Sequence, residues 1–452
     1  MRNSNFNIYV TFSLVALTVL SSCDEFLDVK PKDALATSET VILDKSSAES
    51  ALRGLYNALG DAGYYGTSFQ SIGYLSGDNI QWTGSQSQVQ EFINRKVNAD
   101  NATISSAWNA IYRTINRANN ILAAVLEIKD ATLSESLRSQ ILGEAYFIRG
   151  LAYFDLARTW GGVPIVTSPT KAAGDNANVA KTSVSDTYAQ ALKDLDAAEP
   201  LLPETIDRYR ATKKTVWALK ARYYLYQNNY VKADEYATKI IADVRYKLLK
   251  PFNAFFASNA RGTDESIFEL FYNGTTEVNA HRNQWQPQSN GGTRQWAPND
   301  ALVKLLNDPT IGGTRSTLVA KDNQNRWYGN LYYRTPASDP SYIIRIAELY
   351  LIRAEARAQQ DQLNDALNDL NAVRDRAGLL AITASSKEEI LLTIENERRV
   401  EFALEPHRWF DLVRTGRADE VLNVTEPFRL VFPIPADQVL TDGDLVPQND
   451  GY

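Results

Sequence analysis

The strongest constraint on the fold lies in residues 344–380, which carry apolar side chains at helical spacing in two consecutive stretches. The first stretch is marked by Ile346, Leu349, Tyr350 and Ala354, and the second by Leu363, Ala366, Leu367, Leu370 and Val373. A short polar turn near residues 360–363 separates them, and Gly378 is a typical C-terminal stop. Because neither helix can bury its apolar stripe alone, the pair has to stack on similar helices.

The same pattern recurs along the rest of the chain. Helices are predicted after a cap at Ser46 or Ser47, over residues 104–128, 134–160, 185–199, 212–227 and 230–244, and over residues 386–404 with a restart after Pro406. Residues 191–197 (ALKDLDA) nearly repeat residues 366–372 (ALNDLNA), without a fixed period. We therefore predict a mainly α fold: a tetratricopeptide-repeat-like scaffold of about four helix pairs, with long inserted loops and a few short strands.

Two segments, residues 61–101 and 252–342, interrupt the helical pattern. Both are rich in Gly, Ser, Asn and Gln. Half of the 8 Trp residues lie within them, namely Trp82, Trp285, Trp296 and Trp327. Loops of this length inside a compact chain are usually functional, and their aromatic residues argue against disorder. Short strands are predicted at residues 266–272 and 430–434.

The N-terminus has the pattern of a lipoprotein signal. An apolar run at residues 8–20 is too short to span a bilayer comfortably, and the Leu-Ser-Ser-Cys tetrapeptide that ends at Cys23 resembles a bacterial lipobox. We expect residues 1–22 to be cleaved as a signal peptide, Cys23 to be lipidated, and residues 23–45 to form a tether. The mature protein is then anchored to the membrane rather than spanning it. An ordinary signal peptide with a coincidental Cys is the alternative.

Composition excludes several other classes of protein. With a single Cys, no intramolecular disulfide can form, and with only His281 and His407 besides, a Cys/His zinc site is excluded. The net charge of -7 leaves no basic footprint for nucleic acid.

Several motifs together resemble the SusD/RagB family of Bacteroidetes outer-membrane lipoproteins. They are the lipobox with Phe-Leu-Asp at residues 26–28, WNAIYRTINRAN at 108–119, FIRGLAYFDLARTWGGVP at 147–164, the hairpin at 345–378, ENERRVEFALEPHRWFDLVRTG at 395–416, and FPIP at 432–435 with the terminal QNDGY. The family usually has Pro where Asp450 stands, and often has Gly at the position of Pro406. Both are turn positions, so neither departure alters the assignment.

The resemblance implies a single domain over residues 46–452, with the family's C-terminal region at about 260–452. It implies a cell-surface protein of the outer membrane that binds oligo- or polysaccharide and delivers it to a partner SusC-like TonB-dependent transporter. The ligand site is expected in inserted loops, at residues 61–101 and 273–333. A peptide ligand, as in RagB-like proteins, is an alternative. No cofactor and no catalytic activity are implied.

Two further classes compete with this interpretation. One is a pure interaction scaffold that binds a partner peptide through its helix pairs. The other is a glycoside hydrolase, because 54 Asp and Glu residues offer many carboxylate pairs. Glu397, Arg398, Arg399 and Glu401 have the look of a catalytic cluster, but a structural ion network at a helix crossing is the favoured interpretation. His407 is expected to pack in the last helix.

For the ligand site we expect aromatic rings to stack on the C–H face of a sugar, with polar side chains bonding its hydroxyl rim. The favoured rings are Trp82, Trp285, Trp296 and Trp327, followed by Tyr64, Tyr65 and Tyr328. The favoured polar partners are Asp78, Asn79, Gln81, Arg294 and Gln295. The alternative is that the Trp residues pin the loops to the helical core, because Trp is highly buried on average.

Overall fold

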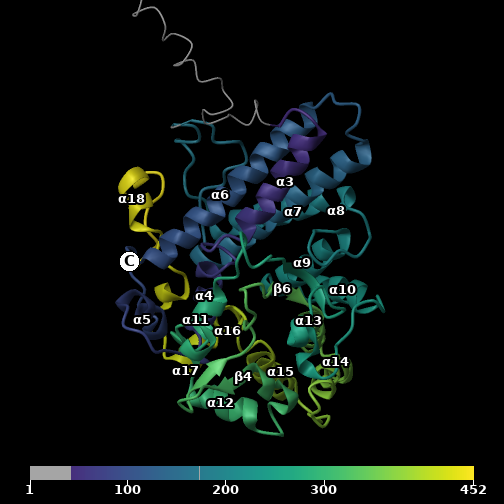
Figure 1. The fold of residues 1–452 in the computed structure, drawn as a ribbon, viewed down its shortest axis with the longest axis vertical. Coiled ribbons are helices and arrows are strands. Elements are labelled where there is room, and N and C mark those ends of the chain that lie inside the picture. Colours follow the sequence, from purple (N-terminus) through teal and green to yellow (C-terminus); the bar gives the residue numbers. More distant parts are fainter. Residues whose placement is uncertain (1–41, 173) are drawn as a thin grey trace, which may run out of the picture.

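The computed structural model describes residues 42–172 and 174–452, and this part of the chain is mainly α-helical (Figure 1). The predicted signal peptide, Cys23 and nearly all of the predicted tether lie outside the described residues. The tether is predicted to end at residue 45, where the first described helix begins.

Antiparallel helix pairs form the scaffold, as predicted. Its helices are α3 (Lys45–Leu59), α6 (Ala102–Ala124), α7 (Glu135–Trp160), α8 (Val184–Leu201), α9 (Lys213–Tyr226), α10 (Tyr230–Ile241), α13 (Ile346–Gln359) and α14 (Leu363–Arg376). The long helices α3, α6, α7 and α8 lie together at the top of Figure 1, and α9, α10, α13 and α14 continue down its right side. Helix α7 packs against α6, α8 and α3, so all but Tyr146 of residues 141–160 are buried.

Helix boundaries differ from the predictions at several ends; α10, for example, ends at Ile241 rather than at residue 244. The starts of α13 and α3 differ for reasons that the structure makes clear. Residues 344 and 345 belong to a strand, so α13 begins at Ile346 rather than at residue 344. The cap of α3 is Asp44, whose carboxylate accepts from Ser47 N, while the Ser47 hydroxyl accepts from Asp44 N. This reciprocal capping box satisfies two free N–H groups, which a serine cap at residue 46 or 47 would not do.

The two inserted segments contain more secondary structure than their composition indicates. The first holds α4 (Ser68–Leu75), β1 (Ile80–Trp82) and α5 (Ser87–Asn94). The second holds η2 (Phe252–Phe255), η3 (Ala257–Asn259), β2 (Ser266–Leu270), α11 (His281–Trp285), η4 (Gln288–Asn290), β3 (Trp296–Pro298), α12 (Asp300–Asn307), η5 (Gly313–Leu318), β4 (Val319–Lys321), β5 (Trp327–Gly329) and β6 (Ser341–Arg345). None of these helices exceeds eight residues, which is too short to produce a sustained apolar period.

Three two-stranded antiparallel sheets lie in these segments of the described structure: β1 with β3, β2 with β6, and β4 with β5. The predicted strand at residues 266–272 is β2, which is fully buried beside β6. The β1–β3 pair joins the first inserted segment to the second across more than 200 residues of chain.

The C-terminal part closes the fold with α15 (Lys387–Glu401), α16 (Arg408–Arg414), α17 (Ala418–Leu422), η6 (Pro427–Leu430) and α18 (Ala436–Asp442), while η1 (Val125–Glu127) extends α6. The strand predicted at residues 430–434 is absent from the described structure. Side chains take the place of a partner strand, because Ile434 N donates to Gln448 Oε1 at 2.7 Å and Asn449 Nδ2 donates to Phe432 O at 2.8 Å.

Candidate functional site

The two inserted segments meet at the β1–β3 pair, as the sequence predicts. Ile80 lies opposite Pro298, Gln81 opposite Ala297, and Trp82 opposite Trp296. The contact continues past the strands, because Thr83 N donates to Gln295 O at 2.9 Å. Strand β5 packs on β3 in turn, so residues from three strands gather at one place.

Beneath this junction lies a buried aromatic cluster, and two predicted ligand-stacking residues belong to it. Trp285 is 0% exposed and Trp296 is 6% exposed. Their rings are 5.8 Å apart, and both contact Tyr74 at 5.3 Å. The prediction that Trp285 and Trp296 stack on a ligand is therefore wrong for this structure: they fill the space beneath the strands, which is the pinning role considered as the alternative.

Tyr64 and Tyr65 are also buried, and the prediction that they contact ligand is wrong for the same reason. Both hydroxyls donate to Asp155 Oδ2, at 2.7 and 2.8 Å. Asp155 in turn pairs with Arg158 within α7. The tyrosines therefore fix the first inserted segment to the scaffold.

Asp78 and Asn79 hold β1 in place rather than pointing toward a ligand. Asp78 accepts from Arg408 Nε at 2.7 Å and pairs with Arg399 at 3.0 Å. Burial by itself raises the pKa of Asp78, but Arg408 and Arg399 hold it below its ordinary value. The buried Asn79 bonds Arg399 Nε and Arg399 O through its two amide atoms. These contacts replace the ligand contacts predicted for both residues.

The remaining predicted residues stay accessible. Trp82, Trp327 and Tyr328 are half-buried, and we call these three rings the aromatic edge. The Trp82 ring lies against the backbone of Gly84, where a Cβ atom would be 2.2 Å from Cζ2 of the ring. Lys321 Nζ lies 4.9 Å from the centre of the Trp327 ring.

Polar side chains accompany the aromatic edge. Arg294 Nε donates to Trp327 O at 2.8 Å, and Gln81 Nε2 donates to Pro298 O at 3.0 Å. Both side chains, together with that of Gln295, are half-buried. Each contact ties one strand to another, so the edge is held by both backbone pairing and side chains.

A polar cleft of about 620 Å³ begins one residue after Gly84. It is lined by Ser68 at the start of α4, residues 85–89, and Ala102, Thr103 and Ser106 of α6. None of these residues was a sequence-predicted site residue. Their hydroxyl and amide groups are common in ordinary loops, and only the proximity to Trp82 distinguishes them.

His281 supports the aromatic edge from below. It is fully buried, its ring stacks on Tyr332 at 4.7 Å, and Nδ1 lies 2.9 Å from Asn279 Oδ1. Because Asn279 Oδ1 also accepts from His281 N, Nδ1 is the protonated nitrogen. Burial lowers the pKa of His281 to about 3, so the ring is neutral at physiological pH.

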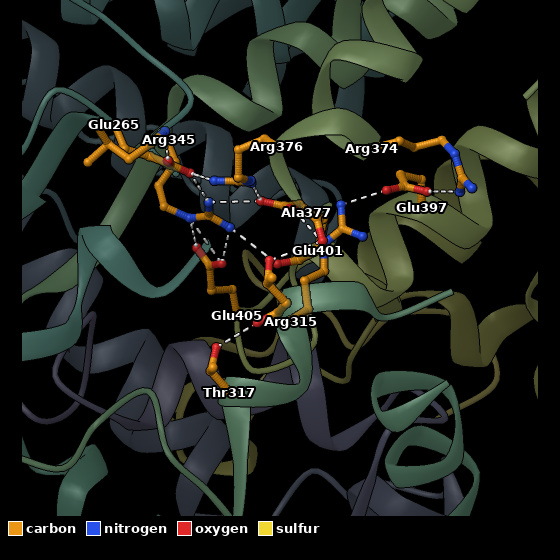
Figure 2. A network of polar contacts seen from close by, with 12 residues as sticks. Glu265, Arg315, Thr317, Arg345, Arg374, Arg376, Ala377, Glu397, Glu401 and Glu405 are labelled. Atoms are coloured by element: carbon orange, nitrogen blue, oxygen red, sulfur yellow. Dashed lines mark hydrogen bonds and ion pairs between the residues drawn. The ribbon is translucent and has the colours of Figure 1, made fainter. Parts of the chain in front are cut away.

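The charged cluster around Glu397 and Glu401 is a buried ion network, not an open catalytic site (Figure 2). Arg315 donates to both glutamates, and Arg345 bonds Glu265 at 2.7 Å and Glu401 at 3.0 Å. Burial raises the pKa of Glu401, but Arg376, Arg315 and Arg345 lower it to about 2. The remaining members are Arg374 and Glu405.

The other two residues of that sequence cluster are also structural. Arg398 pairs with Asp411 at 2.7 Å, and Arg399 bonds β1. His407 packs on Phe402 with ring centres 4.4 Å apart, and burial lowers its pKa well below the ordinary value.

In residues 42–172 and 174–452 no helix combines the length and apolarity that crossing a membrane requires. Within the same residues, no three His, Cys, Asp or Glu side chains come together in an arrangement that could hold a metal ion.

Comparisons with known proteins agree over most of the chain. A family model described as "Starch-binding associating with outer membrane" matches residues 25–225, and one described as "SusD family" matches residues 269–427. A SusD-like protein of Formosa agariphila is 26% identical, over 95% of this chain and 96% of its own. The starch-binding protein SusD of Bacteroides thetaiotaomicron is 23% identical, over 87% and 86%.

Solved structures share the fold. A SusD superfamily protein from Bacteroides vulgatus superposes with a TM-score of 0.81 at 23% identity, covering 90% of this chain and 99% of that one. A laminarin-binding SusD-like protein gives a TM-score of 0.79 at 22% identity, covering 91% and 100%.

Proposed function

Since the chain belongs to the SusD/RagB family of carbohydrate-binding outer-membrane proteins, we propose that it captures oligo- or polysaccharide at the cell surface and delivers it to a SusC-like TonB-dependent transporter. We place the glycan at the aromatic edge and the polar cleft beside it. The observation that carries this placement is the half-buried Trp82 ring, held against Gly84 on the β1–β3 pair. Strand β5, with Trp327 and Tyr328, packs on β3, and the half-buried Gln81, Arg294 and Gln295 accompany these strands. Rings bind the C–H face of a sugar, and amides and guanidinium groups bond its hydroxyls.

The same surroundings argue for binding without hydrolysis. Hydrolysis of a glycosidic bond uses two carboxyl groups about 5–9.5 Å apart on either side of the bond. The described carboxylates nearest the aromatic edge in sequence are already engaged: Asp78 pairs with two arginines, and Asp322 accepts from Gln324 N, Arg326 N and Arg326 Nε. We therefore propose a protein that holds glycan and does not cleave it.

Affinity electrophoresis in gels that contain laminarin or starch, supported by a glycan array, tests glycan binding. We expect retardation by at least one neutral glycan and no release of reducing sugar on long incubation. Binding of a peptide library with no binding to any glycan would favour the RagB-like alternative. Release of reducing ends would contradict the non-enzymatic part of the proposal.

Delivery and anchoring have their own tests. Purification of the protein from solubilised outer membranes is expected to recover a TonB-dependent transporter as a stoichiometric partner. Mass spectrometry of the mature N-terminus is expected to find a lipid-modified Cys23, and Cys23→Ala is expected to leave the protein unanchored or uncleaved. A mature chain that begins elsewhere without lipid would contradict the proposed anchor.

A further inference from the structure

A second cleft, of about 950 Å³, lies between α3, the loop that precedes α9 and the chain that leaves β2. Phe271 and Tyr209 supply its aromatic surface, and Glu49, Asn57 and Glu277 are among its polar residues. We call it the Phe271 cleft. It shares no lining residue with the aromatic edge or with the polar cleft beside Trp82.

Phe271 is an exposed ring that its neighbours hold in place. It is 48% exposed, and it is the one aromatic residue among the exposed large apolar side chains of residues 42–172 and 174–452. Tyr209 meets it edge-on at 5.8 Å, and the Arg261 guanidinium lies over the ring at 5.3 Å. Arg261 is itself fixed by a 2.9 Å hydrogen bond to Ser338 Oγ. The ring is therefore oriented before any ligand arrives.

The supporting Tyr209 is fixed by close packing. Its hydroxyl lies 2.7 Å from the position that a Cβ atom on Gly262 would occupy, and Gly262 has a φ of +53°. Only glycine meets both conditions without strain. The aromatic surface of the cleft thus rests on the turn at Gly262, whose N–H also donates to Glu269 Oε1 at 2.6 Å.

Polar groups of α3 lie along the same cleft. Glu49, Arg53 and Asn57 are spaced four residues apart, so they share one face of the helix. In the described structure the side chains of Glu49 and Asn57 make no hydrogen bond, and they are free to bond a ligand. An aromatic ring beside unengaged amide and carboxylate groups is the combination that a sugar ring needs.

The charges of the cleft favour a neutral sugar over a uronate. Glu49 and Glu277 bring negative charge, whereas the charge of Asp61 is offset by Arg113 at 3.5 Å. Arg210 is already bidentate on the buried Glu144, at 2.9 and 2.8 Å, which leaves Arg53 as the cation not occupied by a carboxylate. A sugar carboxylate would meet this excess of negative charge, whereas hydroxyl groups donate to carboxylates.

We infer that the Phe271 cleft is a second carbohydrate-binding subsite, which takes neutral sugar residues with Phe271 as the stacking ring. This inference rests on the proposed function, because it presumes that the chain binds glycan. One turn separates the two clefts: Ala62 lines the Phe271 cleft, and Ser68, which donates to Ala62 O at 2.8 Å, lines the polar cleft beside Trp82. A long glycan therefore contacts both places, whereas a short one occupies one of them.

Calorimetry on the full mature chain tests the inference with laminarihexaose and maltohexaose as neutral probes, the corresponding trisaccharides, and hexagalacturonate as the uronate probe. Phe271→Ala is expected to weaken binding of the preferred hexasaccharide about tenfold, in line with the loss of a stacking residue. Phe271→Tyr is expected to restore it to within about twofold, because a phenol ring stacks equally well. Leu440→Ala, which truncates an exposed apolar side chain on α18, serves as the matched control.

The outcomes separate the two claims. If the parent chain binds neither hexasaccharide, the glucan form of the proposed function fails and the second subsite fails with it. If the parent binds and Trp82→Ala weakens binding, but Phe271→Ala binds the hexasaccharide as well as the parent does, only the second subsite is overturned. The parent is also titrated with hexagalacturonate as the uronate probe. If Phe271→Ala weakens the binding of hexagalacturonate as much as it weakens the binding of the neutral hexasaccharide, the preference for neutral sugars is overturned. An unchanged unfolding midpoint in Phe271→Ala shows that the variant is folded.

Discussion

The buried ion network and the aromatic edge show two different uses of residues that are conspicuous in the sequence. In the network, eight side chains of opposite charge pair with one another away from water. At the edge, three rings remain partly exposed, although Trp82 and Trp327 also pack in part against the core. A cluster whose charges are all paired supports the fold, whereas the partly exposed rings of the edge are the part of the molecule that we propose for ligand.

The same distinction divides the aromatic residues themselves. Trp296 and Trp82 face each other across the β1–β3 pair, yet Trp296 packs into the core while Trp82 lies on Gly84 with part of its ring exposed. Burial of Trp285, His281 and Tyr332 beneath Trp296 gives the edge a rigid base. Substitutions that affect the base should change stability, and those that affect the edge should change binding.

The largest expected effect follows from removing a charge of the ion network. Arg345→Met removes the arginine that pairs with Glu405, and it leaves Glu265 and Glu401 each with one ion pair fewer in the interior. The substitution should lower the free energy of unfolding by about 5 kcal/mol. Urea denaturation measures this change. Lys250→Met is the control, because the Lys250–Asp375 pair is exposed and should cost less than about 1 kcal/mol. Similar losses in the two variants would contradict the structural role of the network.

Truncating the base of the edge should be next in size. Trp285→Ala removes a ring that is 0% exposed and should destabilise the protein by about 3–4 kcal/mol through lost contacts and a cavity. Thermal unfolding by calorimetry measures it. If the variant is as stable as the parent but binds glycan more weakly, Trp285 contacts the ligand rather than supporting the edge.

The pH dependence of stability tests the neutral state of His281. The ring titrates near 6.5 in the unfolded chain and at about 3 in the folded protein, so the unfolded state binds more protons between these values. The free energy of unfolding should therefore fall as the pH drops below about 6.5, by at most about 1.4 kcal/mol per pH unit from this residue. His407 acts in the same direction.

Denaturation of the parent and of His281→Gln at pH values from 7 to 5 isolates that contribution. The variant should show the shallower slope, because His407 remains in both proteins. Parallel slopes would mean that His281 is not buried as a neutral ring.

A smaller effect on stability, with a clear effect on binding, is expected at Gly84. Gly84→Ala places a methyl group where the Trp82 ring lies, so the ring has to move. Because the far end of a side chain yields more readily than backbone, the cost in stability should stay below about 1 kcal/mol. Glycan affinity should fall nonetheless. Leu440→Ala, whose exposed side chain lines neither cleft, is the control. Equal affinity in the two variants would contradict the proposed position of the ring.

Much of the scaffold could be predicted from sequence because its helices are long and periodic. The pairs α9–α10 and α13–α14 match their predicted residues to within a few positions, since each carries a repeated apolar stripe. Helices α4, α5 and α12 were missed because eight residues give only two turns of pattern. The strand predicted at residues 430–434 failed because side-chain amides bond its backbone instead.

The meeting of the two inserted segments could be predicted from sequence, but the exposure of their individual side chains could not. Composition located the two segments that meet at β1 and β3. It could not separate Trp82 from Trp285 or Trp296, because exposure depends on what packs behind each ring. Asp78 illustrates the same limit for polar residues: its two partners, Arg399 and Arg408, lie more than 300 residues away in the chain. The polar cleft beside Trp82 has no sequence signature at all.

Binding of glycan at the aromatic edge is tested by the single variant Trp82→Ala. Calorimetric titration with a glycan that the parent binds should show affinity reduced by about 1–3 kcal/mol, the usual cost of truncating a residue that carries binding energy. The same preparation should unfold near the parent's midpoint, because the Trp82 ring is half-buried and packs only in part against the core. If Trp82→Ala binds glycan with the affinity of the parent, or if it loses stability sharply and not affinity, Trp82 is not a glycan-binding residue.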